Sequence, residues 1–384
     1  MRFRDALAAP GLGAIAEIKR RSPSLGEIRP DADPALIAAG YERAGAAAIS
    51  VLVDERFGGD WNDLRAARAS VSAPLLAKGF FSAEEHLRTA KEAGADAVLL
   101  LLRDLDDGET MRLMALAAEL ELDTLVEAHN AAELERAIAF GAPVIGVNAR
   151  DLATFQIDRR AQLELVARIP NDRIAIAESG ISNRAQGAAA ELAGADAILV
   201  GSALMQAPDP AEKLAELLSR PLVKVCGLTR EEDVAAAAGA GADLAGFILA
   251  KESPRRAAAV LDVPETMLAV AVWVGEPGES SAALDQLYER SGDHRSRDAM
   301  LLRDGELVGT VLDLPWQDDD PEHWARAAEV EGRVMLAGSL AADNVQAAIE
   351  RVRPWAVDAS SRLELEPGIK DNEAVRAYVE AARA

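Results

Sequence analysis

The sequence lacks the features that mark secreted and membrane-spanning proteins. Cys226 is its only cysteine, so no disulfide can form within the chain. No uninterrupted apolar run is long enough to cross a bilayer. The first seven residues also lack the apolar stretch of a signal peptide. We therefore expect a soluble, cytoplasmic protein that has no membrane partner.

Basic residues are scarce relative to acidic ones. The chain has 41 lysines and arginines against 64 aspartates and glutamates, which gives a net charge of -23. Because nucleic acid is itself a polyanion, this charge excludes non-specific nucleic-acid binding. A small anionic ligand needs only a local positive site, so it remains possible.

The length of 384 residues favours two domains. In the first, residues 1–220, short apolar runs alternate with longer amphipathic segments. Runs that are apolar throughout are typical of strands covered on both faces. Eight such strand–helix units in about 200 residues predict a parallel (β/α)8 barrel of the TIM type. The runs are Ala14–Lys19, Ala47–Asp54, Pro74–Phe80, Ala97–Leu102, Asp123–Ala128, Pro143–Asn148, Ile174–Gly180 and Ala197–Ser202.

Polar side chains gather where these runs end, and in TIM-type barrels that edge carries the chemistry. Glu17 and Lys19 share one face of the first strand, because side chains alternate with a period of two. Small residues after the seventh and eighth runs would let backbone N–H groups approach a phosphate ester. A merely solvated rim and glycines that serve turn geometry alone are the alternatives. The candidate residues are Glu17, Lys19, Ser22, Lys78, Phe80, Glu127, Asn148, Arg150, Glu178, Ser179, Gly180, Gly201 and Ser202.

The segments around these residues resemble the signature blocks of indole-3-glycerol phosphate synthase. The blocks are Glu17–Ser24, Ala77–Phe80, Leu125–Ala128, Ile145–Leu152, Ala177–Ile181 and Val200–Met205. The resemblance implies decarboxylation and cyclisation of 1-(o-carboxyphenylamino)-1-deoxyribulose 5-phosphate, with no metal or cofactor. It implies that Lys78 is the general acid at the ketone oxygen and that Glu127 handles protons in the dehydration. It also implies that Lys19 is catalytic: it would bind the substrate carboxylate and assist as an acid. It assigns substrate binding to Glu17, Phe80, Asn148, Arg150, Glu178 and Ser179, and phosphate binding to Ser22, Gly180, Gly201 and Ser202.

Several features bear on how well the resemblance holds. The family usually has an aspartate where Gly79 stands, the loop at 55–61 is unusual, and the family's N-terminal helices are nearly absent. A different phosphate-binding barrel would use paired aspartates where Lys19 and Glu127 stand, and a non-enzymatic scaffold would be indifferent to loss of Lys78. Mutual repulsion and desolvation at the rim are expected to lower the pKa of its lysines.

A second domain is expected from residue 221 to 384. Seven strands are predicted, one fewer than a closed barrel needs, so the second (β/α) barrel is expected to be shortened and possibly incomplete. The predicted strands are Leu222–Cys226, Leu244–Leu249, Leu268–Val274, Ala299–Leu302, Leu307–Leu312, Arg333–Ala337 and Ala356–Ala359. The predicted helices are Glu231–Ala240, Ser281–Arg290, Pro321–Val330, Asp343–Val352 and Asn372–Ala382.

This half resembles phosphoribosylanthranilate isomerase, which makes the synthase's substrate by an Amadori rearrangement. The resemblance lies in Lys224–Thr229, Glu252–Arg255, Leu312-Asp313, Leu336–Leu340, Asp343–Val345, Val357–Ser361 and Pro367–Asp371. It implies that Cys226 is the general base, that Asp313 is the general acid and that Arg255 lies near a phosphate. A thiolate can act as that base only if its surroundings lower the pKa of the thiol.

The departures in this half leave two hypotheses open. Leu301–Asp304 stands in place of the family's Gln-Leu-His-Gly block, the acidic segment Leu314–Asp320 replaces a glycine-rich phosphate loop, and Arg362 replaces a glycine. The domain is either a working isomerase on a reduced barrel or a structural domain that keeps only the family's shape. In both cases we expect small phosphorylated, anthranilate-derived substrates and a monomeric protein.

Overall fold

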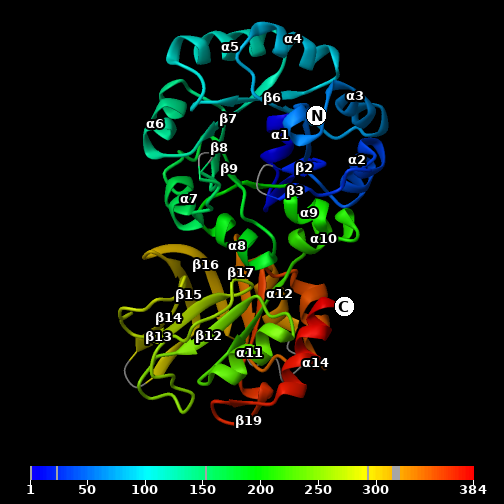
Figure 1. The fold of residues 1–384 in the computed structure, drawn as a ribbon. Coiled ribbons are helices and arrows are strands. Elements are labelled where there is room, and N and C mark those ends of the chain that lie inside the picture. Colours follow the sequence, from blue (N-terminus) through cyan, green and yellow to red (C-terminus); the bar gives the residue numbers. More distant parts are fainter. Residues whose placement is uncertain (1, 23–24, 152–153, 292–293, 314–320) are drawn as a thin grey trace. The chain divides into compact units, whose positions relative to one another are not determined.

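The computed structural model describes residues 2–22, 25–151, 154–291, 294–313 and 321–384. The chain divides into two compact units (Figure 1). The first consists of residues 1–183 and 187–218, and the second of residues 184–186 and 219–384. No helix among the described residues is both long enough and apolar enough to span a membrane.

The first unit is a closed barrel of eight parallel strands, as the sequence predicts. Its helices form a ring around the strands (Figure 1). The strands are β1 (Gly13–Ile18), β4 (Ala48–Leu52), β5 (Leu75–Lys78), β6 (Ala97–Leu101), β7 (Asp123–Ala128), β8 (Val144–Asn148), β9 (Ile174–Glu178) and β10 (Ala197–Val200). A small hairpin, β2 (Arg21–Ser22) with β3 (Gly26–Glu27), follows β1.

Polar caps begin many of the helices that follow these strands. Asp33, Asp60, Asp106, Asn130 and Asp158 accept hydrogen bonds from backbone N–H groups in the first turn of their helices. The helices are α1 (Phe3–Leu7), α2 (Pro34–Arg43), α3 (Trp61–Ser70), α4 (Glu84–Glu92), α5 (Asp107–Glu119), α6 (Ala131–Ala139), α7 (Arg159–Val166), α8 (Arg184–Leu192), α9 (Ser202–Gln206) and α10 (Pro210–Leu218), with a 3₁₀ turn, η1 (Glu55–Phe57).

The apolar runs are buried in two layers. One cluster lies inside the barrel, where Ile15, Leu76, Leu99 and Leu125 pack together. Phe3 of the short helix α1 belongs to this inner cluster, so this helix contributes to the barrel interior. A larger cluster fills the space between the strands and the surrounding helices. Two-sided burial explains why these strands are apolar throughout.

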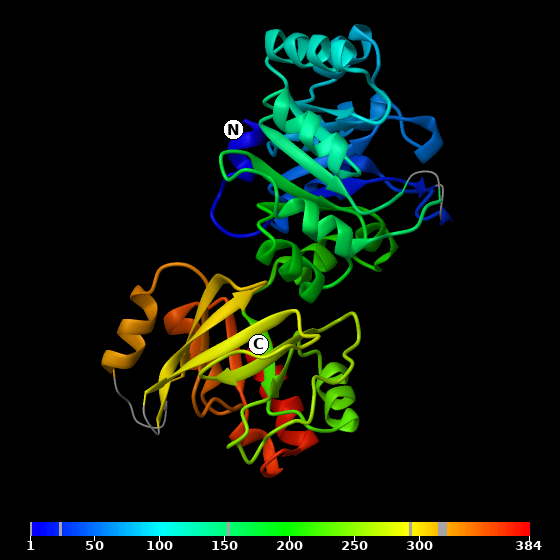
Figure 2. The same cartoon turned by 90° about the vertical axis from the view of Figure 1, so that its left-hand side faces the viewer.

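The second unit is also a closed barrel of eight strands, so the prediction of seven strands and a possibly incomplete barrel is wrong. The strands are β11 (Leu222–Cys226), β12 (Leu244–Ile248), β13 (Leu268–Val274), β14 (Leu284–Ser291), β15 (His294–Arg303), β16 (Glu306–Asp313), β17 (Val334–Ala337) and β18 (Ala356–Ala359). β15 runs antiparallel to both of its neighbours, and every other neighbouring pair is parallel. Figure 2 shows β14, β15 and β16 as long strands in yellow.

The missing strand is the segment predicted as the helix Ser281–Arg290, most of which forms β14. Leu284, Gln286 and Tyr288 are buried at alternate positions, which is the period of a strand. At the other end of β15, Asp304 and Gly305 both have positive φ, at 51° and 83°, as a tight hairpin turn requires. Two hairpins therefore replace strand–helix units, which shortens this barrel without opening it.

The helices of the second unit are grouped early and late in its sequence. They are α11 (Glu231–Gly239), α12 (Pro321–Glu329), α13 (Val345–Val352) and α14 (Asn372–Arg383). Between α11 and α12, the part of the chain that the structure describes forms no helix. After β18 a 3₁₀ turn, η2 (Ser361–Leu363), leads into the small hairpin of β19 (Glu364–Glu366) and β20 (Ile369–Lys370).

Candidate active sites

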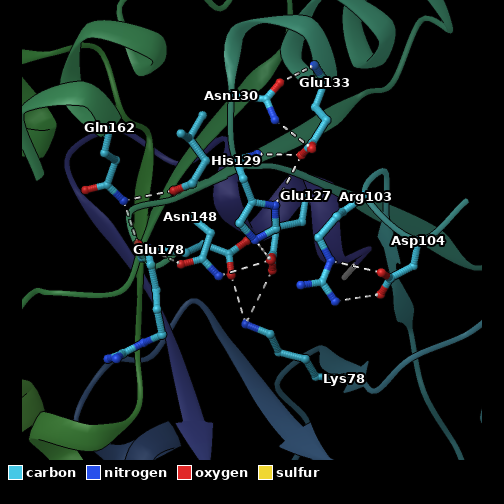
Figure 3. A network of polar contacts seen from close by, with 12 residues as sticks. Lys78, Arg103, Asp104, Glu127, His129, Asn130, Glu133, Asn148, Gln162 and Glu178 are labelled. Carbon is cyan, nitrogen blue, oxygen red and sulfur yellow. Dashed lines mark hydrogen bonds and ion pairs between the residues drawn. The ribbon is translucent and has the colours of Figure 1, made fainter. Parts of the chain in front are cut away.

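A compact cluster of amines and carboxylates lies at the C-terminal ends of the first barrel's strands. Lys78, the last residue of β5, extends its amine towards the carboxylates of Glu127 and Glu178 (Figure 3). Its Nζ atom lies 2.8 Å from Glu178 Oε2, 3.3 Å from Glu17 Oε2 and 3.9 Å from Glu127 Oε2. Lys19 Nζ lies 2.7 Å from the other oxygen of Glu17. The structure thus brings together five of the predicted residues from four strand ends.

Burial and charge act in opposite directions on Lys78. Burial alone would lower its pKa, but Glu178, Glu17 and Glu127 together raise the pKa above the ordinary value of a lysine. The predicted lowering of the lysine pKa values is therefore wrong for Lys78. The prediction counted the repulsion between amines, whereas three carboxylates surround this one.

The three carboxylates of the cluster differ in pKa although all are buried. Burial would raise the pKa of Glu17, but Lys19 and Lys78 lower it to about 2. The pKa of Glu127 also falls to about 2, because His129 and Lys78 outweigh burial. Burial raises the pKa of Glu178 to about 8, and the negative charge of Glu127 contributes to that rise. Of the three carboxyl groups, Glu178 is thus the one that binds a proton most readily.

His129, which the sequence analysis did not single out, supports Glu127. It follows β7 directly, and its Nε2 atom lies 3.1 Å from Glu127 Oε1 at ion-pair distance. Its Nδ1 atom lies 3.2 Å from Glu133 Oε2, an oxygen that also accepts the backbone N–H of His129 at 2.8 Å. Burial would lower the pKa of His129, but these two carboxylates raise it to about 10. The available signal was the spacing of a glutamate two residues before and another four residues after a histidine.

We expect the stabilisation by His129 to depend on pH. A folded-state pKa raised from 6.5 to about 10 means that the contribution is complete below pH 6.5 and is lost as the pH rises through 10. His129→Gln should therefore lower the stability of the first barrel by about 2 kcal/mol at pH 6, the scale of a charged hydrogen bond, and by much less at pH 10. Thermal unfolding at both pH values measures this, with His86→Gln as the control. An equal loss at both pH values would contradict it.

Asn148 and two glycines complete the geometry of the cluster. Asn148 Nδ2 donates to Glu127 Oε1 at 3.0 Å, and its Oδ1 accepts the backbone N–H of Arg150 at 2.9 Å. A Cβ atom added at Gly146 would lie 2.1 Å from Glu178 Oε1, and one at Gly201 would lie 2.3 Å from Glu17 Oε1. Glycine at these two positions therefore leaves the space that the carboxylates occupy.

The remaining predicted residues lie outside this ion cluster or beside it. Phe80 stacks on Phe57 with ring centroids 6.3 Å apart, and the Arg56 guanidinium lies 3.7 Å from its ring centroid. Arg150 Nη1 donates to the carbonyl of Phe155, and Ser22 Oγ accepts the backbone N–H of Leu25.

The predicted phosphate residues lie at the starts of the following loops and helices. Ser179 and Gly180 both have φ of 70°, and the Gly180 carbonyl accepts a hydrogen bond from Arg159. Gly201 is the N-cap of α9, and Ser202 is its first residue. The role of Ser179 in substrate binding and that of Gly180, Gly201 and Ser202 in phosphate binding stay predictions.

The second barrel holds a cavity of about 470 Å³ that contains all three residues predicted for it. Cys226, Arg255 and Asp313 line it together with Gln286, Tyr288 and Asp358. Arg255 Nε lies 2.7 Å from Glu364 Oε2, and Lys370 pairs with the other oxygen of Glu364 at 2.8 Å. Burial raises the pKa of the Cys226 thiol, although Lys224 acts in the opposite direction. The structure therefore does not show the lowering of this pKa that a thiolate base needs.

The next residues to place are those at which this half departs from the isomerase family. Leu301–Asp304, which stand in place of the family's Gln-Leu-His-Gly block, lie at the end of β15, and Gln286-Leu287-Tyr288 lies on the fourth strand, β14. The acidic segment Leu314–Asp320 lies outside the described residues. Arg362 pairs with Asp343 at 2.7 Å. In the described part of the chain, no group of three or more His, Cys, Asp or Glu side chains could hold a metal ion.

Comparison with known proteins gives two family matches. The model "Indole-3-glycerol phosphate synthase" matches residues 1–217, and "N-(5'phosphoribosyl)anthranilate (PRA) isomerase" matches residues 293–381. Indole-3-glycerol phosphate synthase of Mycobacterium ulcerans is 43% identical over 215 residues, covering 56% of this chain and 79% of the relative. That of a Nocardioides species is 47% identical over 203 residues, covering 53% and 78%. The crystal structure of phosphoribosyl anthranilate isomerase from Thermotoga maritima is similar at 22% identity and a TM-score of 0.35, covering 43% of this chain and 99% of that one.

Proposed function

The chain belongs to the indole-3-glycerol phosphate synthase family, and from that premise we propose that its first barrel converts 1-(o-carboxyphenylamino)-1-deoxyribulose 5-phosphate to indole-3-glycerol phosphate. The observation that supports this most directly is the ammonium of Lys78 held among three buried carboxylates at the barrel rim. The reaction needs an acid, a base and a cation for the substrate carboxylate in one place, and the cluster offers all three.

The proposed roles follow from the charges of the cluster. Lys78, kept protonated by its neighbours, donates to the ketone oxygen as the aromatic ring attacks the ketone carbon. Lys19 binds the carboxylate that leaves as carbon dioxide. Glu127 then takes up a proton as water is lost, and its buried Oε2 atom has no hydrogen-bond partner among the described residues. Glu17, Asn148 and Glu178 hold the substrate and the two amines, while Ser22, Gly180, Gly201 and Ser202 bind its phosphate.

The pH dependence of this activity should come from Glu178. Glu127 would gain a proton only well below pH 5, because its pKa is about 2, and Lys78 would lose its proton only above pH 9, because its pKa is raised. Neither group therefore changes the activity between pH 5 and 9. Glu178, with a pKa of about 8, loses its proton within the range and adds a negative charge beside Lys78. That charge stabilises the ammonium of Lys78 and makes it a weaker proton donor. We expect kcat/KM to fall several-fold as the pH rises through 8, and Glu178→Gln to remove that fall. A fall that persists in the variant would contradict the assignment.

We propose that the second barrel is a working isomerase that acts on N-(5-phosphoribosyl)anthranilate. The supporting observation is that Cys226, Asp313 and Arg255 line a single cavity. Asp313 would protonate the ring oxygen as the furanose opens, and the Cys226 thiolate would then take the proton from C2. Ser360 Oγ in the cavity wall is buried without a hydrogen-bond partner among the described residues, so a ligand phosphate would satisfy it.

Two assays on the intact protein test these proposals separately, one with each substrate. Absence of either product contradicts the activity of the corresponding barrel.

We further propose that the protein acts as a cytoplasmic monomer in tryptophan biosynthesis. Light scattering in solution would test the monomeric state, and complementation of a tryptophan auxotroph would test the role in the pathway.

A further inference from the structure

Tyr288 of the second barrel makes a hydrogen bond to the proposed general acid. Its hydroxyl donates to Asp313 Oδ2 at 3.1 Å, and its side chain is buried. The two residues lie on β14 and β16, on either side of the antiparallel strand β15. Both line the cavity that also holds Cys226.

The register of the three strands explains how Tyr288 reaches across. Tyr288 pairs with Ala299 on β15, and Ala299 pairs with Val311 on β16. Residues paired in this way point to the same face of the sheet, and Asp313, two residues further on, points to that face as well. Because Ala299 has only a methyl group, the tyrosine ring can extend over it towards Asp313.

A second set of hydrogen bonds fixes the direction of the Tyr288 hydroxyl. Gln286 Nε2 donates to the hydroxyl oxygen at 2.8 Å, and Gln286 Oε1 accepts from Lys224 Nζ at 2.5 Å. Lys224 is fully buried and also pairs with Asp358 at 2.8 Å. A lysine ammonium can only donate, so the amide oxygen of Gln286 must face Lys224 and its NH2 group must face Tyr288. The Tyr288 proton therefore points to Asp313.

We infer that Tyr288 is a positioning residue for the isomerase reaction: it holds the Asp313 carboxyl in the orientation from which that group serves the substrate. The inference rests on the proposed isomerase function. Tyr288 stands on β14, the fourth strand of the second barrel. The chain of hydrogen bonds from Asp358 through Lys224 and Gln286 gives the tyrosine a fixed support within the barrel.

The test is removal of this one hydroxyl in the intact protein. Tyr288→Phe should lower kcat for isomerisation by about 10- to 100-fold and leave KM unchanged, because a misplaced acid slows the chemistry without altering substrate binding. In a double-mutant cycle, Tyr288→Phe should have no further effect on Asp313→Asn, because the tyrosine acts through that carboxyl. Tyr378→Phe is the matched control, since the Tyr378 hydroxyl is buried in the same barrel without a hydrogen-bond partner in the described part of the chain.

The outcomes separate this inference from the function on which it rests. A wild-type protein without isomerase turnover overturns both. If the wild-type protein isomerises its substrate and the Tyr288→Phe variant keeps the wild-type kcat, the inference alone is overturned. The same holds if Tyr288→Phe lowers the kcat of the Asp313→Asn variant by the factor by which it lowers that of the wild-type protein. A loss of kcat that Tyr378→Phe reproduces would show that the hydroxyl serves packing, and would also overturn it.

Discussion

Replacement of Lys78 by methionine should lower kcat/KM for indole-3-glycerol phosphate formation by at least about 10³-fold, within the range for loss of a general acid. Methionine keeps much of the length of the side chain but carries no proton to donate. It also leaves Glu17, Glu127 and Glu178, all within 3.9 Å of the missing ammonium, without their shared cation. Steady-state formation of the indole product measures the effect, and isomerase turnover by the same sample should be unchanged.

Two further variants separate chemistry from folding in this experiment. Lys91→Met makes the same substitution at an exposed position of α4 and should keep full activity. Lys78→Arg keeps a positive charge among the carboxylates, so it should unfold near the wild-type temperature while still losing most activity, because a guanidinium is a poor proton donor. A folded Lys78→Met protein that retains more than about a tenth of the wild-type kcat/KM would exclude Lys78 as the general acid.

The first barrel could be predicted from sequence because its strands carry two independent signals. Runs such as Ile174–Glu178 are apolar enough to require cover on both faces, and they end in chargeable residues that a barrel brings to one rim. What could not be predicted was the balance of charges within that rim. The pKa of Lys78 depends on how many carboxylates come within a few ångströms of it. The spacing of Glu127, His129 and Glu133 in the sequence did not by itself show that the two carboxylates contact the histidine, as they do in the structure.

The second barrel could be predicted only in part because its middle departs from the strand–helix repeat. In β14, Leu284 and Leu287 are three residues apart, a spacing that also suits a helix, and the buried polar residue Gln286 hides the alternation of a strand. The Asp304-Gly305 pair is a hairpin signal, but it has meaning only once an antiparallel neighbour is considered. Because strand–helix units were expected throughout, one strand was missed and its segment was predicted as a helix.

Replacement of Cys226 by alanine should lower kcat for the isomerase reaction by at least about 10³-fold, since it removes the only proposed base for the proton on C2. Cys226→Ser should be nearly as slow, because a hydroxyl ionises far less readily than a thiol and so supplies almost no anion to act as the base. Synthase activity measured on the same sample should be unchanged and thereby reports that the protein is folded. If the second barrel is only structural, wild-type and Cys226→Ala proteins will show the same absence of turnover.

Alkylation provides an independent test of the same residue, because Cys226 is the only cysteine in the chain. Burial raises the pKa of its thiol, so the unliganded protein should react slowly with iodoacetamide at pH 7 and faster as the pH rises and the thiolate forms. Modification of one sulfur should abolish isomerase activity and spare synthase activity, and product or substrate in the 470 Å³ cavity should protect against it. A fully alkylated protein that still isomerises its substrate would exclude the thiol as the base, whatever the kinetics of the alanine variant.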